Sequence, residues 1–223
     1  IFRNEWLKTY TWLDSQTLQY TTPAGIKTPL HLAQCDLVVL VDPGGFGAGQ
    51  DDRARAAIVV MAHTPTGEYL LLDCWSDKDT YVACQQRIVH LVRKYRPRKV
   101  GIEQAGQQIV FIDQTKRMLQ DAGLPVTVES LKTDGKHKDD RILTLEPFFQ
   151  RGLIYIGTGA AFTEFRTQYT QFPRSARRDI LDALAYFPKL VRPRNNGISG
   201  QQRQQQEKAQ YYRKRGMVPG GSP

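Results

Sequence analysis

The 223-residue sequence is poor in cysteine and has no long hydrophobic run. Its three cysteines, Cys35, Cys74 and Cys84, form no CxxC pair, which argues against a disulfide scaffold or structural zinc and predicts that they fill the core. Apolar runs such as residues 37–41 are far shorter than the roughly 20 residues of a membrane-spanning helix, so no membrane partner is expected. Because the sequence starts at Ile1 without a basic and apolar leader, we expect it to be part of a longer protein.

Acidic residues are in the minority. The sequence holds 31 Lys and Arg against 22 Asp and Glu, a formal net charge of +9, which favours a polyanionic partner such as nucleic acid. The excess is uneven, because residues 192–223 carry seven basic side chains against the single acid Glu207. This stretch is rich in Gln, Arg and Gly and has few branched apolar residues, so it is predicted to be a disordered tail.

The chain divides into three predicted parts: a connecting arm at residues 1–34, a folded domain at 35–191 and the tail at 192–223. Within the domain, apolar runs separated by turns predict an antiparallel meander of strands at 36–42, 57–62 and 69–75. The spacing of the apolar residues and the positions of Gly and Pro then predict a helix at 81–95, a strand at 99–103, a helix at 109–119 and a strand at 126–131. They further predict a helix around 142–149, a strand at 153–156 and a last helix around 180–187 that Pro188 ends. The predicted fold is a mixed α/β sheet, three antiparallel strands followed by parallel strand-helix units, flanked by helices.

Two carboxylates stand at the ends of predicted strands. Asp42 follows the most apolar strand and precedes a Gly-rich turn, and Glu103 ends the strand at 99–103. Strand carboxyl ends are where α/β sheets present functional groups. Taken alone, either acid could equally well serve only to cap the turn that follows its strand. Two such acids on strands that could be neighbours favour a shared site.

A second pair of acids belongs to the last predicted helix. Asp179 and Asp182 are three residues apart and so share one helix face. The helix dipole favours an acid in the first turn, which accounts for Asp179 but not for Asp182. Clustered carboxylates repel one another unless a hard divalent cation neutralises them, and magnesium is the natural candidate. Two such ions activate water and stabilise the leaving oxygen in phosphodiester cleavage.

Basic residues near these acids are candidates for holding a phosphate backbone without reading its sequence. They are Lys132, Lys136, Lys138, Arg141, Arg174, Arg177 and Arg178. The three-residue spacing of Lys138 and Arg141 puts both near one helix face, although each of the seven could instead be a solvated surface charge. The Gly-rich stretch at 44–51 has the spacing of a phosphate loop, but Gln50 and Asp51 replace its Lys and Ser/Thr, which argues against nucleotide binding.

Four blocks in order carry a resemblance: VVLVDPGG, VGIEQAG, LKTDGKHKDDRI with LEPFFQRGLIYI, and FPRSARRDILDALAYF. Together they resemble the nuclease domain of the large terminase subunit of tailed bacteriophages, one of the RNase H-like nucleases, over about residues 2–190. The resemblance implies an endonuclease that cuts double-stranded concatemeric viral DNA during genome packaging, with two Mg²⁺ or Mn²⁺ ions. It implies that Asp42, Glu103 and Asp179 are the catalytic, metal-binding acids, that Asp182 is an additional ligand, and that Asp51 or Asp52 approaches the second metal.

The resemblance also implies a setting. It places an ATPase domain before the arm at residues 1–34, gives the portal protein and the small terminase subunit as partners, and locates the protein in the cytoplasm of the infected bacterial host. The isolated domain is expected to be a monomer. Arg177 and Arg178 stand where family members often have a His or a second acid. Two alternatives stay open: another RNase H-like nuclease, such as a junction resolvase or a transposase, and a non-catalytic module for DNA binding or motor docking.

Overall fold

The computed structural model describes residues 1–44, 55–104, 109–133, 135 and 137–191. The chain divides into two units, Ile1–Arg192 and Pro193–Pro223. The predicted tail lies outside the described residues, as do Asp51, Asp52, Lys136 and most of the Gly-rich stretch at 44–51. In the part of the chain that is described, no helix combines the length and the apolar character that crossing a bilayer requires.

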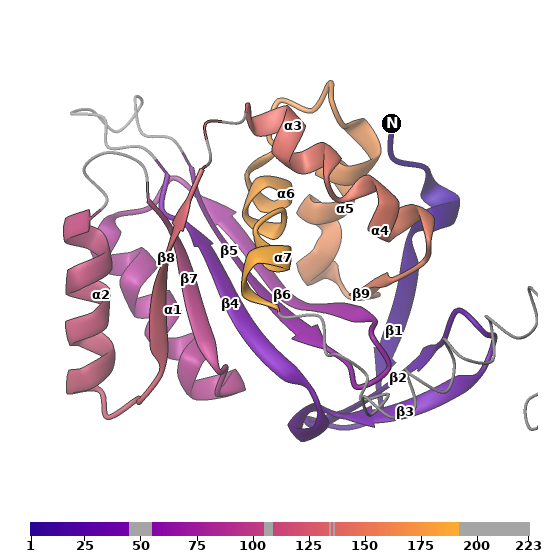
Figure 1. Cartoon of the computed structure of the whole chain (residues 1–223), viewed down its shortest axis with the longest axis horizontal. Helices are drawn as coiled ribbons and strands as arrows, with labels where there is room; N and C mark the ends of the chain where they lie inside the picture. Colours follow the sequence, from indigo (N-terminus) through magenta and orange to yellow (C-terminus); the bar gives the residue numbers. More distant parts are fainter. Residues whose placement is uncertain (45–54, 105–108, 134, 136, 192–223) are drawn as a thin grey trace, which may run out of the picture. The chain divides into compact units, whose positions relative to one another are not determined.

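A nine-stranded mixed sheet organises the first unit (Figure 1). Its order is β3-β2-β1-β9-β6-β5-β4-β7-β8. The strands are β1 Lys8–Trp12, β2 Thr17–Thr21, β3 Lys27–His31, β4 Asp36–Asp42, β5 Ala56–His63, β6 Tyr69–Asp77, β7 Lys99–Gln104, β8 Thr127–Lys132 and β9 Ile154–Gly157. Strands β4, β5 and β6 form the predicted antiparallel meander, and β7 and β8 continue from β4 in parallel. The predicted fold class is therefore confirmed.

Helices cover both faces of the sheet (Figure 1). They are α1 Tyr81–Tyr95 and α2 Ile109–Asp121 on one face, and α3 Lys138–Leu143, α4 Glu146–Gln150, α5 Thr163–Gln171, α6 Asp179–Leu184 and α7 Phe187–Leu190 on the other. Strand β4 is buried between them because its side chains alternate: Val39 and Val41 pack with α1 and α2, whereas Val38 and Leu40 pack with α3 to α7. This alternation explains why the sequence of β4 is a continuous apolar run.

Two predicted helices are each divided in two, and a proline explains both corrections. The helix expected around 142–149 is α3 followed by α4, and the last helix is α6 followed by α7. Pro147 and Pro188 lie in the first turns of α4 and α7. Proline has no backbone N–H to donate and is tolerated in a first turn. Pro188 therefore begins a new helix, and the prediction that it ends one was wrong.

Residues 1–34, predicted as a connecting arm, contribute strands to this sheet. β1, β2 and β3 form an antiparallel meander that joins the sheet through parallel pairing of β1 with β9. Phe2 stacks on Tyr169 of α5 with a ring centroid separation of 4.9 Å. The segment therefore packs on the folded domain itself, and its connection to an ATPase domain stays a prediction.

The cysteines largely follow the prediction. Cys74 and Cys84 are buried in the core, whereas Cys35, which precedes β4, is only partly buried. Cys74 and Cys84 are free thiols. Burial raises the pKa of the Cys74 and Cys84 thiols to about 12, which makes them inert fillers rather than nucleophiles.

Gly101 allows α7 to lie close to β7. A Cβ atom at this position would lie 2.4 Å from Cδ1 of Leu190 and 2.7 Å from Cδ1 of Leu131, both buried. We expect Gly101→Ala to lower the free energy of unfolding by about 1–3 kcal/mol, because two packed side chains must move. Urea denaturation measures this. Gly159→Ala is the matched control, since a Cβ there meets nothing within 4 Å; equal midpoints for the two variants would contradict the prediction.

Candidate metal centre

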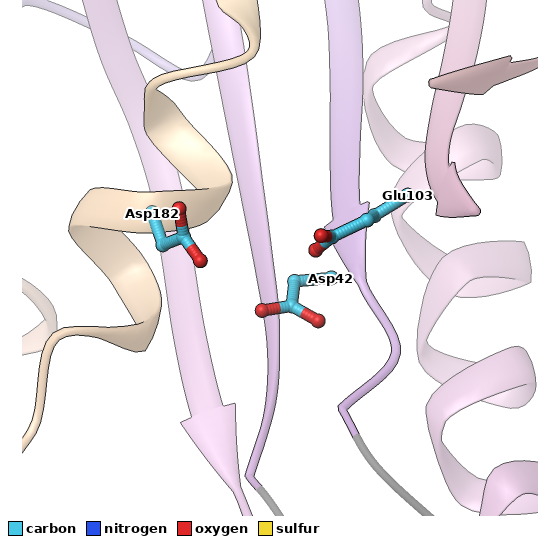
Figure 2. A group of neighbouring side chains, drawn as sticks. All are labelled: Asp42, Glu103 and Asp182. Atoms are coloured by element: carbon cyan, nitrogen blue, oxygen red, sulfur yellow. The ribbon is translucent and has the colours of Figure 1, made fainter. Parts of the chain in front are cut away.

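Three buried carboxylates meet at one end of the sheet (Figure 2). Asp42 ends β4, Glu103 lies near the end of β7, and Asp182 lies on α6. One carboxylate oxygen from each residue lies within 4.8 Å of the other two. The exposed fractions of the residues are 8%, 6% and 2%. We call these three residues the acidic triad.

The sheet register brings Asp42 and Glu103 together. β4 and β7 pair in parallel with Val41 opposite Ile102, so the next residue on each strand, Asp42 and Glu103, lies side by side. Partners in a parallel pair point to the same face. This is the arrangement that the sequence predicted for acids at the carboxyl ends of neighbouring strands.

Helix α6 packs over β4 and β5 and brings Asp182 to the other two acids (Figure 2). It packs its apolar residues against the sheet in the same core cluster as Val38 and Leu40. Its N-terminus is held by Gln168, whose side-chain oxygen accepts hydrogen bonds from the backbone N–H of Ile180 at 3.0 Å and of Leu181 at 3.4 Å. Gln168 is 1% exposed and satisfies donors that the first turn of a helix leaves unpaired.

Asp179 lies outside the acidic triad. The resemblance gave it as a catalytic acid and Asp182 as an additional ligand, but it is Asp182 that the structure brings to Asp42 and Glu103. The side chain of Asp179 is 17% exposed and accepts a hydrogen bond from Nζ of Lys138 at 2.9 Å, whereas that of Asp182 is 2% exposed. The two acids share a flank of α6, but only one reaches the triad.

Each acid of the triad has a protein partner. The backbone N–H of Gly44 donates to Oδ1 of Asp42 at 2.9 Å. The Tyr186 hydroxyl donates to Oε1 of Glu103 at 2.9 Å. Tyr186 is not among the predicted site residues, because an aromatic residue at helical spacing resembles a core residue. Its position four residues after Asp182, on the same side of a helical segment, was the available signal.

Arg141 binds Asp182 through two hydrogen bonds. Its Nε donates to Oδ1 at 3.0 Å and one terminal nitrogen donates to Oδ2 at 2.7 Å. The same terminal nitrogen lies 3.7 Å from Oε1 of Glu103, and the guanidinium lies 5.4 Å from the centre of the Tyr186 ring. Lys138 adds a second cation, with Nζ 3.5 Å from Oδ2 of Asp182. Helix α3 thus supplies two positive charges to the acids.

Residues 39–188, which include the whole triad, match the family described as "Terminase RNaseH-like domain". The chain belongs to this family. None of the curated proteins matches it. Solved structures similar to this terminase RNaseH-like domain include Thermus thermophilus RuvC in complex with a Holliday junction substrate, at 14% identity, TM-score 0.41 and coverage of 67% of this chain and 89% of the other. The fowlpox virus Holliday junction resolvase is 13% identical, with TM-score 0.44 and coverage of 70% and 99%.

The donor set of the terminase RNaseH-like domain suits a hard cation. Burial, and after it the charge of Glu103, raises the pKa of Asp42 well above its ordinary value, so these carboxylates are costly to keep ionised together. The ligands are all carboxylate oxygens, which Mg²⁺, Mn²⁺ and Ca²⁺ prefer over the softer metals. A divalent cation between the three acids would offset both burial and repulsion. The residues present therefore fit the metal that the family resemblance implies.

The predicted DNA-binding residues of the domain fall into two groups. Lys132, Arg174 and Arg177 are exposed. Of these, Arg177 has a weak ion pair with Glu164 at 3.8 Å. The remaining described residues, Lys138, Arg141 and Arg178, are engaged with acids, Arg178 donating to both oxygens of Asp139 at 2.6 and 2.8 Å. Burial lowers the pKa of Lys138, but Asp179 and Asp182 outweigh it, so the pKa is raised and the ammonium stays charged.

Proposed function

We propose that this terminase RNaseH-like domain is a metal-dependent endonuclease that cuts double-stranded concatemeric DNA during viral genome packaging. The observation that carries the proposal is the buried, all-carboxylate triad in a chain of this family. Asp42, Glu103 and Asp182 would hold divalent metal, two Mg²⁺ or Mn²⁺ ions in our proposal. When bound, the metal supplies an activated water and stabilises the leaving oxygen in phosphodiester hydrolysis.

The chain's own residues have separate tasks in this proposal. Tyr186 keeps Glu103 oriented toward the other acids, and Gly44 does the same for Asp42. The exposed Lys132, Arg174 and Arg177 would bind the phosphate backbone. Asp51 and Asp52 stay candidates for the second metal. The portal protein and the small terminase subunit as partners, and the cytoplasm of an infected bacterium as the location, also belong to the proposal and rest on the family resemblance.

Plasmid cleavage tests the proposed function. We expect the full chain to nick and linearise supercoiled plasmid in Mn²⁺ or Mg²⁺, and to do neither when EDTA is added, because in this proposal the metal activates the water and stabilises the leaving oxygen. Cleavage that persists in EDTA would contradict the proposal. A linear duplex and a four-way junction of equal length are the matched substrates. Similar rates support an endonuclease of duplex DNA, whereas much faster cleavage of the junction would favour a resolvase.

A further inference from the structure

We propose that Arg141, with Lys138 beside it, is a built-in counter-ion of the acidic triad that competes with divalent metal for Asp182. This inference rests on the proposed function of the triad as a metal site and adds a positioning residue to it. In the absence of metal, Arg141 would hold the Asp182 carboxylate in place through its two hydrogen bonds. When metal binds, the guanidinium of Arg141 would be released from the acids and become available to DNA phosphates.

The geometry shows how fully Arg141 engages the site. Its two hydrogen bonds use both oxygens of Asp182, and its terminal nitrogen also faces Glu103 at 3.7 Å. The side chains of Arg141 and Asp182 are 13% and 2% exposed, so water screens the pair weakly. A two-point contact between a guanidinium and a carboxylate is among the stronger hydrogen-bonded ion pairs.

Charge sets the direction of the effect. Removing one partner of a buried ion pair leaves the other uncompensated, so the metal-free protein without Arg141 is destabilised. A divalent cation near Asp182 and Glu103 would be repelled by the guanidinium that already contacts both carboxylates. The same substitution therefore weakens the metal-free fold and strengthens metal binding. A purely structural contact would do only the first.

The chain contains a matched control for this pair. Arg178 precedes α6 and donates to both oxygens of Asp139 on α3. It also joins α3 to the start of α6, through a single guanidinium nitrogen and with the two side chains 33% and 43% exposed, but no ion pair between it and an acid of the triad is present among the described residues. Its loss should loosen the contact between α3 and α6 without changing the charge that a metal at the triad experiences.

The test uses the full chain in the absence of DNA. Isothermal titration calorimetry measures its affinity for Mn²⁺, and thermal unfolding measures its Tm. We expect R141Q and R178Q both to lower Tm without metal. R141Q should bind Mn²⁺ about tenfold more tightly than wild type, whereas R178Q binds with wild-type affinity. Equal or weaker Mn²⁺ binding by R141Q would overturn the inference. If R141Q does not fold, K138Q replaces it, with a smaller gain in affinity expected because its Nζ is 3.5 Å from Asp182.

Failure of the inference and failure of the proposed function give different results. If wild type binds no Mn²⁺, or if D182N binds Mn²⁺ as tightly as wild type, the triad is no metal site and both proposals fail. If wild type binds Mn²⁺ through the triad and R141Q gains nothing, the counter-ion inference alone is overturned.

Discussion

Asp182→Asn is expected to lower metal-dependent plasmid cleavage by about 10³-fold, because it replaces a buried ligand of the triad by a neutral amide that holds a hard cation poorly. Loss of such a ligand removes several kcal/mol of transition-state stabilisation, and about 4 kcal/mol corresponds to this change in rate. The measurement is the initial rate of nicking in Mn²⁺ at a fixed protein concentration.

Asp179→Asn is the control for this prediction, since it changes the same residue type three positions away on the same helix. Asp179 is partly exposed and pairs with Lys138 outside the triad. An ion pair of this kind contributes at most about 1 kcal/mol, so the rate should stay within about tenfold of wild type. If instead Asp179→Asn abolished cleavage and Asp182→Asn did not, the assignment of the triad would be wrong. Circular dichroism of both variants separates loss of chemistry from loss of fold.

The pairing of Asp42 with Glu103 could be predicted from the sequence because it depends on two local patterns. A continuous apolar run and a following Gly-rich turn define β4, and a shorter run ends at Glu103. Once both are strands of one parallel pair, their carboxyl ends lie at the same end of the sheet. Burial on both faces, shown by Val38 and Val39 packing in opposite directions, is what makes the pattern of β4 so clear.

The choice between Asp179 and Asp182 could not be predicted in the same way. Helical spacing puts the two acids on one flank, but the depth of each depends on where α6 sits over the sheet. Contacts with other elements determine that position, among them the hydrogen bonds that Gln168 of α5 accepts from the N-terminus of α6. The strands β1 and β2 were missed for a similar reason. Tyr10 is the only buried residue of β1, and β1 is secured by a partner strand more than 140 residues later.

The second prediction concerns salt. Binding of duplex DNA to the full chain in EDTA is expected to weaken by about 40-fold or more between 50 and 200 mM NaCl, if at least three cations such as Lys132, Arg174 and Arg177 contact phosphates and release counterions. Fluorescence anisotropy of a labelled duplex measures this. The steepness should not depend on Lys138, because without metal its ammonium is already paired with Asp179.

Paired substitutions therefore separate the two groups of cations. The double variant Arg174→Gln with Arg177→Gln should lower the slope of log affinity against log salt by about 2, since each phosphate contact contributes about 0.9. Lys138→Gln, measured beside it in EDTA, should leave the slope unchanged. An unchanged slope in the double variant would place the phosphate contacts elsewhere on the chain. A reduced slope for Lys138→Gln would mean that this ammonium reaches DNA while it is still paired with Asp179.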